Sequence, residues 1–407
     1  MLSSGHTKWE ILMSISNKNK MKRKIIAISG ARSDYDLLYS VYHSLNKDER
    51  FDFAIVITGP NLSDTYGYTA SNIEKDGFRI ASRIFNLVDS NKKIGRIISI
   101  GNQIPSLAHV LMQEQPDIVL VAGDREEAIS VSLTCAYMDI PVAHFFGGDI
   151  AKDGNIDNAV RYATSKFAHI HFPSLPEHRE TLLKLGEDDW RIFVVGNPAL
   201  DRLISVSEIS KEQILWVLDK GEDFSDYCVL IQHSIITQVD KQAEHIRITL
   251  DAILKSGKAC FINYPNSDAG SVDIIQAYHE YTTKYPDNFV FFKNLDREIY
   301  VNLLRNALFL IGNSSSGLVE VGSLGLPAIN VGNRQKGRLH GDNVIFVDND
   351  EQEILTAINK VLTDEEFIRI TKLKNNPYGE GKSAEKVVRI LAEIDLNEAL
   401  LHKNITY

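Results

Sequence analysis

Short apolar runs alternate with segments of helical periodicity along most of the chain. Each run is almost continuously hydrophobic, as a strand must be when helices cover both faces of its sheet. In the first half we predict strands at 25–29, 53–58, 118–122, 142–146, 168–172 and 192–195. In the second half we predict strands at 228–232, 259–263, 290–292, 308–311, 328–331 and 344–347. The alternation therefore predicts two α/β regions with parallel sheets.

Residues 196–210 interrupt this alternation, and we interpret them as the connection between two domains. The predicted parts are a disordered lead-in at 1–22, an N-terminal Rossmann-like domain at 23–200 and a C-terminal Rossmann-like domain at 201–382. Residues 383–407 are expected to form a helix that packs back on the first domain. The predicted fold class is α/β, with two doubly wound domains facing a cleft and a ligand at the carboxyl ends of their strands.

Composition and charge argue against some classes of ligand and indicate the cellular compartment. The chain has 407 residues, of which 44% are hydrophobic, so it can fill two cores. Its net charge is -10 and no basic run occurs, which argues against nucleic acid. No apolar run approaches the length of a membrane span. The cysteines Cys135, Cys228 and Cys260 are far apart in apolar segments, which indicates reduced thiols in a cytoplasmic protein.

The most informative stretch is 311–341, where a short strand is followed by a polar loop and small residues. Three serines fall where a helix is expected to begin: Ser314, Ser315 and Ser316. Their hydroxyls and the N–H groups of a first helical turn would favour an anion. Glu320 lies one turn further and could accept hydrogen bonds from a sugar diol, while Arg334 follows the next strand. The stretch predicts a seat for a phosphorylated ligand; the alternative is an ordinary serine-capped turn.

The loop after the first strand reads SGARSDYDLL. It has one glycine where a dinucleotide fingerprint needs three, so we expect no nicotinamide cofactor. Arg32 stands at the carboxyl end of this strand and could clamp a phosphate. A solvated loop arginine is the alternative interpretation.

Acidic residues gather after two later strands of the first half. Asp124 follows the strand 118–122, and Asp149 follows a pair of glycines after the next strand. Asp157 and Arg161 are four residues apart, so they share a face if Asp157 opens a helix. We interpret these acids as candidates for proton transfer, with a plain helix ion pair as the alternative for Asp157 and Arg161.

Three histidines and an asparagine complete the candidates. His169 and His171 alternate on a strand without a third metal ligand, so we interpret them as structural. His233 comes directly after the strand 228–232 and could donate to a phosphate or move a proton near neutral pH. Asn266 also follows a strand, where a turn and helix cap is an equally good interpretation.

These segments together resemble the hydrolysing UDP-N-acetylglucosamine 2-epimerases of bacterial sialic-acid pathways. The resemblance covers about residues 24–347 and rests on ordered segments of both halves. These are ARSDY, AGDREEA, GGD, GNIDNAVRYATSK, IQHSIITQ, YPNSDAGS, IGNSSSGLVEVGSLGLPAINVG and NRQKGR. It implies a glycosyltransferase-B-like fold. It also implies conversion of UDP-N-acetylglucosamine and water to UDP and N-acetylmannosamine, without metal or redox cofactor, by a homo-oligomeric dimer or tetramer.

The resemblance also implies roles for the candidate residues. The positions that match the family's nucleotide-binding residues are Arg32, Asn266, Ser314, Ser315, Glu320 and Arg334. The positions that match residues at the reacting sugar are Asp124, Asp157, Arg161 and His233. We expect Asp124 and Asp157 to act on opposite faces of the sugar, with Asp149 as the reserve acid.

Two positions depart from the family pattern. Phe146 stands where other members carry Glu or His, and Asn61 stands where many have His. We expect both to lie on the sugar side of the site, so the nucleotide is better defined than the hexosamine. One alternative is the same reaction on a UDP-2,4-diacetamido-2,4,6-trideoxyhexose, as in legionaminic acid synthesis. The pattern is also compatible with a UDP-sugar glycosyltransferase, or with a sugar-nucleotide sensor without turnover.

Overall fold

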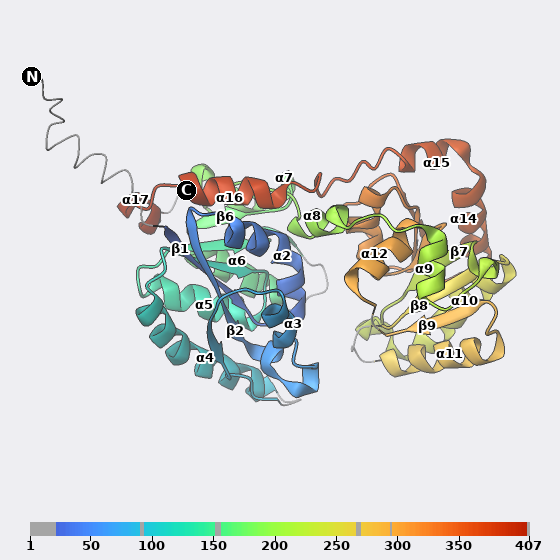
Figure 1. Ribbon diagram of the computed structural model, residues 1–407, viewed down its shortest axis with the longest axis horizontal. Helices are drawn as coiled ribbons and strands as arrows, with labels where there is room; N and C mark the ends of the chain where they lie inside the picture. The colour runs from blue at the N-terminus through green and yellow to red at the C-terminus, as the bar shows by residue number, and fades with distance from the viewer. Residues whose placement is uncertain (1–21, 90–92, 151–155, 266–269, 294, 405–407) are drawn as a thin grey trace, which may run out of the picture. The chain divides into compact units, whose positions relative to one another are not determined.

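The computed structural model describes residues 22–89, 93–150, 156–265, 270–293 and 295–404 (Figure 1). Apart from Lys22, the predicted lead-in lies outside these residues. The chain forms two compact units. One ends at Ala199 and resumes at Lys382, and the other runs from Leu200 to Gly381. Within the described residues, no helix is both long and apolar enough to cross a membrane.

The first unit is built on a six-stranded parallel sheet. Its strands are β1 (Arg23–Ser29), β2 (Phe51–Thr58), β3 (Ile80–Ile84), β4 (Ile118–Ala122), β5 (Val142–Phe145) and β6 (Ile170–Phe172). They are ordered β3-β2-β1-β4-β5-β6, and Ile25 of β1 lies opposite both Phe53 and Ile118. The sequence missed β3, and the strand predicted at 192–195 is wrong, because only an isolated bridge joins Ile192 to His171.

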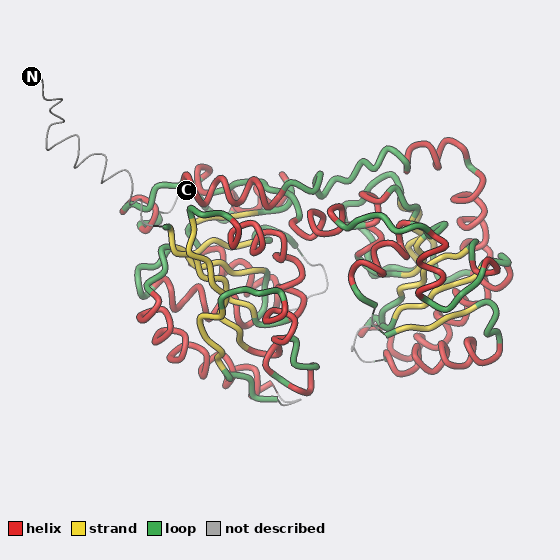
Figure 2. The backbone as a smooth tube through the Cα atoms, in the orientation of Figure 1, coloured by secondary structure: helices red, strands yellow, loops and turns green. Residues whose placement is uncertain are grey.

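The second unit repeats this arrangement. Its strands are β7 (Tyr227–Ile231), β8 (Ala259–Asn263), β9 (Phe289–Phe292), β10 (Leu310–Gly312), β11 (Ala328–Val331) and β12 (Val344–Val347). They are ordered β12-β11-β10-β7-β8-β9, so in both sheets the first strand lies beside the fourth. Figure 2 shows the strands of each unit as one layer among helices. Ligands of such sheets bind where the loops after these two central strands separate.

Helices connect the strands, as parallel pairing requires. The helices associated with the first sheet are α2 (Arg32–Lys47), α3 (Ala70–Lys75), α4 (Lys93–Glu114), α5 (Glu126–Ala136), α6 (Asp157–Phe167), α7 (Pro176–Lys184), α16 (Ser383–Glu393) and α17 (Glu398–Leu401). Those of the second are α8 (Pro198–Ser205), α9 (Lys211–Val217), α10 (Gln242–Lys255), α11 (Ser271–Lys284), α12 (Arg297–Arg305), α13 (Ser316–Val319), α14 (Glu351–Thr363) and α15 (Glu365–Thr371). Short 3₁₀ turns lie at Gly59–Leu62, Asp64–Tyr66, Asp189–Arg191, Glu222–Phe224, Ile236–Lys241 and Val321–Leu324.

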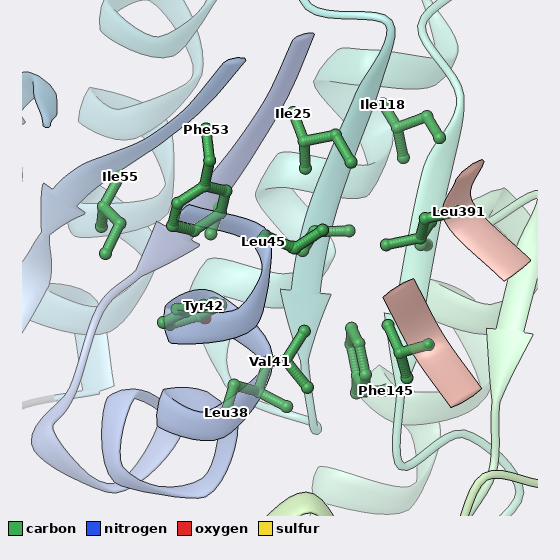
Figure 3. Close-up of a cluster of buried hydrophobic side chains, with 14 of the residues drawn as sticks. Ile25, Leu38, Val41, Tyr42, Leu45, Phe53, Ile55, Ile118, Phe145 and Leu391 are labelled. Atoms are coloured by element: carbon green, nitrogen blue, oxygen red, sulfur yellow. The ribbon is translucent and has the colours of Figure 1, made fainter. Parts of the chain in front are cut away.

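Alternate residues of β1 enter two different cores, which explains its unbroken hydrophobic run. Ile25 packs in the core that contains side chains of α2 and α16, whereas Ile26 packs in the core that contains side chains of α4 and α5. Figure 3 shows the first core, where Leu38 and Leu391 approach the same face of the sheet. The last long helix therefore belongs to the core of the first unit, although the whole second unit separates it from β1 in sequence.

A C-terminal strap, which we define as residues 397–404, is tied to the first unit by two cationic side chains. Arg191 is almost fully buried, and its guanidinium donates to the carbonyls of Ala399 and Leu400, each at 2.6 Å. Lys403 donates in the opposite direction, to the Ala168 carbonyl at 2.6 Å and to other carbonyls at the end of α6. The carboxylate of Glu187 lies 2.6 Å from the Lys403 ammonium. The strap thus satisfies carbonyls that a helix leaves unpaired at its C-terminus.

The ionised carboxylate of Glu187 should make the stability of the first unit fall as the solution becomes acidic. Burial alone would raise its pKa, but the hydrogen bond from His171 and the charge of Lys403 lower the pKa to about 2. A depressed carboxyl pKa contributes stability that is complete above the ordinary value and is lost as pH falls through the folded value. We expect Glu187→Gln to cost about 3 kcal/mol at pH 7, because Lys403 loses its buried partner.

The difference between wild type and Glu187→Gln in urea unfolding should shrink between pH 7 and pH 3. Glu366→Gln is a matched control, because Glu366 pairs with Arg369 on the exposed surface. It should unfold like the wild type at both pH values. A Glu187→Gln difference that is equal at pH 7 and pH 3 would contradict the assignment.

Candidate active site

The guanidinium of Arg161 joins two loops at the carboxyl edge of the first sheet. Arg161 lies on α6 and is 6% exposed. Its Nη2 donates to the Asp124 carboxylate in the loop after β4, and its Nη1 donates to the Asp149 carbonyl at 2.6 Å in the loop after β5. A buried guanidinium needs such acceptors, so the contacts fix the position of the Asp124 carboxylate.

The three candidate acids have different surroundings. The ion pair of Arg161 that the structure shows is with Asp124, which the alternative interpretation of Asp157 and Arg161 as a plain helix ion pair did not anticipate. Asp157 is the first residue of α6 and is half-buried one turn before Arg161. The carboxylate of Asp149 accepts from the Ile150 N–H at 2.8 Å and lies 3.4 Å from His178 Nε2. The structure therefore brings Asp124, Asp149 and Arg161 together and places Asp157 on the same helix as Arg161.

Phe146 has an unusual backbone at this edge. Its φ is 64°, in the left-handed region that non-glycine residues rarely adopt. The conformation is held by a hydrogen bond from the Phe146 N–H to the Phe172 carbonyl at 3.2 Å. Gly148 follows with φ of 80°, and a Cβ there would lie 2.1 Å from the His178 carbonyl oxygen. Backbone strain and close approach thus coincide in the loop that carries Asp149.

Internal hydrogen bonds join the loops after β1 and β2. Asn61 is fully buried, donates to Ser29 Oγ at 3.0 Å and accepts from Thr69 Oγ1 at 2.6 Å. Asn61 therefore joins the loops after β1 and β2, and its place on the sugar side of the site stays a prediction. Ser29 in turn donates to the carboxylate of Asp34 at 2.7 Å, and burial raises the pKa of Asp34 to about 6.

Arg32 and Gly30 lie in the same loop, but Arg32 is exposed and Gly30 is closely packed. Arg32 opens α2 with its side chain 57% exposed, and its Nε lies 3.4 Å from the Asp36 carboxylate in a surface pair. Gly30 is required by packing, since a Cβ there would lie 2.4 Å from Cγ of Glu127. The buried Glu127 was not singled out in the sequence, and no pattern around it distinguishes it from a first-turn acid.

Asn313 organises the corresponding edge of the second sheet. Its side chain accepts from the His233 N–H at 2.7 Å and donates to the His233 carbonyl at 2.9 Å. Its own carbonyl accepts from Arg334 and from Gln335, each at 3.1 Å. Three loops, after β7, β10 and β11, therefore meet at one buried asparagine. The sequence signal for it was a polar residue directly after a short central strand.

The serine loop is more compact than the sequence suggested. The helix after Ser315 is one turn, α13, and continues as the 3₁₀ turn Val321–Leu324. Ser316 Oγ donates to the Glu320 carboxylate at 2.7 Å, so the i,i+4 relation holds. Ser314 Oγ accepts from the Ser316 N–H at 3.3 Å, and Ser314 and Ser315 are half-buried. Asn266 lies outside the described residues.

The family model for UDP-N-acetylglucosamine 2-epimerase matches residues 43–392. The chain belongs to this family. The predicted family is therefore confirmed. Among the residues that the structure describes, no group of three or more His, Cys, Asp or Glu side chains could hold a metal ion.

The similar proteins align with almost the whole of this chain. It is 33% identical to the hydrolysing UDP-N,N'-diacetylbacillosamine 2-epimerase of Legionella pneumophila, over 95% of this chain and 100% of the relative. It is 32% identical to the hydrolysing GDP/UDP-N,N'-diacetylbacillosamine 2-epimerase of Campylobacter jejuni, over 94% and 98%. The UDP-GlcNAc 2-epimerase of Neisseria meningitidis, solved with UDP-GlcNAc, matches with a TM-score of 0.73 at 21% identity, over 91% and 100%. The predicted pair of Rossmann-like, glycosyltransferase-B-like domains is confirmed.

His233 of this epimerase-family chain carries no charge at neutral pH. Burial, and then the nearby Arg334 guanidinium, lower its pKa to about 4. The expectation that it moves a proton near neutral pH therefore does not fit this environment. A neutral imidazole can still donate one hydrogen bond to an anionic oxygen.

An NMR pH titration of the His233 ring in the ligand-free protein should show protonation near pH 4. Arg334→Gln should raise the midpoint, because it removes a positive charge, yet leave it below about 6.5 because burial persists. Arg338→Gln is the matched control; Arg338 lies in the same loop but bonds to Gln335, and its loss should not move the midpoint. A wild-type midpoint near the ordinary histidine value of about 6.5 would show that His233 is not held in a desolvated state.

Proposed function

We propose that this protein is a hydrolysing 2-epimerase that converts a UDP-2-acetamido sugar and water to UDP and the free 2-epimer. The observation that carries the proposal is the cluster of Asp124, Asp149 and Arg161, which presents a fixed carboxylate at the switch-point edge of the first sheet. Family membership adds the reaction class. The proposed setting is a cytoplasmic homo-oligomer that supplies sialic-acid-type sugar synthesis.

We propose UDP-N,N'-diacetylbacillosamine, a 2,4-diacetamido-2,4,6-trideoxy sugar, as the preferred substrate. The resemblance alone implies UDP-N-acetylglucosamine as the first candidate. The Legionella and Campylobacter relatives, both named for the diacetamido sugar, favour the second possibility. Phe146 supports it as well, because an aromatic residue in the loop that carries Asp149 suits a sugar that has a methyl group in place of a hydroxymethyl group. UDP-N-acetylglucosamine remains the second candidate, since the Neisseria neighbour was solved with it.

The edge of the second sheet is the proposed UDP seat. Ser314 and Ser315 would donate to the diphosphate, and Glu320, already oriented by Ser316, would accept from the ribose hydroxyls. Arg334, placed by the Asn313 carbonyl, would supply positive charge, and the neutral His233 would donate a hydrogen bond. Further contacts proposed from the family pattern are those of Arg32 and Asn266.

The proposed chemistry begins with loss of UDP. The bond from C1 to the diphosphate oxygen breaks, and UDP departs with that electron pair. A carboxylate takes the proton from C2 in an anti elimination, which forms the C1–C2 double bond of a glycal. Water then adds its oxygen to C1, and C2 receives a proton on the opposite face. We assign the two proton transfers to Asp124 and Asp157, while Asp149 holds Arg161 through its carbonyl.

The product decides between this function and a glycosyltransferase or a sensor. With either UDP sugar and no acceptor, the protein should release UDP and a manno-configured sugar, recognised by its small H1–H2 coupling in NMR. The kcat/KM ratio should favour the diacetamido substrate by about tenfold or more. UDP release that requires an added acceptor would indicate a glycosyltransferase. Release of a gluco-configured sugar would contradict epimerisation.

A further inference from the structure

His144 is a buried histidine beside the proposed site that the reaction scheme does not use. It lies on β5 and is fully buried. Its Nε2 is 2.8 Å from the Gly123 carbonyl oxygen, and its Nδ1 is 3.1 Å from Ser165 Oγ. One imidazole therefore spans from the loop after β4 to helix α6.

The two contacts determine the state of the ring. A carbonyl oxygen only accepts hydrogen bonds, so Nε2 must carry the proton that points to Gly123. Nδ1 then accepts from the Ser165 hydroxyl. Burial, which outweighs the bond to Gly123, lowers the pKa of His144 to about 3, in agreement with a neutral ring. His144 is thus a fixed bridge and not a proton donor to substrate.

The bridge closes a ring of contacts around Asp124. Gly123 precedes Asp124, and Ser165 is one helical turn after Arg161 on the same face of α6. The loop after β4 is therefore held to α6 twice, by the ion pair of Asp124 with Arg161 and by the His144 bridge. The bridge has limited room, because a Cβ on Gly147 would lie 3.0 Å from Ser165 Oγ.

The C-terminal end of α6 is also held in place. Lys403 of the C-terminal strap donates to the Ser165 carbonyl at 3.1 Å and to the Ala168 carbonyl at 2.6 Å. Ser165 is therefore held through its backbone by the strap and through its side chain by His144. This arrangement limits movement of α6 relative to the loop after β4.

We propose that His144, acting through the Gly123 carbonyl and Ser165, is a positioning residue that sets the Asp124 carboxylate for proton transfer. The inference rests on the proposed function, because it takes Asp124 as one of the two acids. If His144 were purely structural, replacing it would lower kcat by the same factor whether or not Asp124 is present. A double-mutant cycle separates these two roles.

The test compares His144→Leu, which removes both bonds at similar volume, with His144→Gln, which can keep a donor toward Gly123. His144→Leu should lower kcat about 10- to 100-fold, as loss of a supporting partner does at preorganised sites, with KM and UDP affinity unchanged. His144→Gln should recover most of this loss. In an Asp124→Asn background, His144→Leu should change the residual kcat less than about threefold, since residues that act as a unit are not additive.

Equal fold losses in both backgrounds would overturn the proposal and leave His144 a structural residue. If His144→Leu does not fold, as judged by its thermal midpoint, Ser165→Ala takes its place in the same cycle. Glu320→Ala is the contrasting variant; it should weaken UDP binding without removing the coupling between His144 and Asp124.

A second measurement keeps the test separate from the proposed function. If the wild type turns over neither UDP sugar, the proposed function fails, and the side-chain N–H signals of Arg161 in NMR then decide the positioning role. Protection of these signals from exchange in wild type and its loss in His144→Leu would support the role of the bridge. Unchanged protection would overturn it.

Discussion

The cost of taking the Arg161 guanidinium out of water organises the edge of the first sheet. A buried guanidinium has five N–H groups, and acceptors that meet them offset the cost of burial. Those acceptors come from the loops after β4 and β5, so the position of Arg161 dictates the positions of Asp124 and of the Asp149 backbone. Helix α6, which presents Arg161, is held by the C-terminal strap, and this strap enters the first unit from the far end of the chain.

The second unit has the same sheet order, but its loops meet at a neutral side chain instead of a buried ion pair. Its switch-point loops meet at Asn313, a neutral residue that can accept and donate at once. Arg334 is placed by a backbone carbonyl, and the neighbouring His233 remains neutral because of burial and that positive charge. A site built from neutral donors and arginine suits an anion that arrives with its own charge. This division matches the proposal that most nucleotide contacts and the proton transfers are assigned to different units.

The sequence predicted most strands because buried parallel strands are hydrophobic on both faces. It missed β3, whose Ile80 and Ser82 lie at the edge of the sheet with one partner strand and incomplete burial. The strand expected at 192–195 is equally apolar but forms a single bridge, since hydrophobicity alone does not specify a hydrogen-bonded neighbour. Helical spacing placed Asp157 and Arg161 on one helix, but it could not show that the guanidinium would turn to Asp124. The partners of Asn61, Ser29 and Thr69, could not be predicted for a related reason, because only the fold brings them to it.

The most direct test of the central claim follows the hydrogen at C2. Wild-type protein should be incubated with UDP-N,N'-diacetylbacillosamine, and separately with UDP-GlcNAc, in D₂O, and the released sugar examined promptly by NMR and mass spectrometry. The account predicts one deuterium at C2 of the 2-epimer, because a carboxylate of the first unit removes the original hydrogen and the solvent supplies its replacement. A product that keeps its original C2 hydrogen would show that this bond is never broken and would contradict the proposed mechanism.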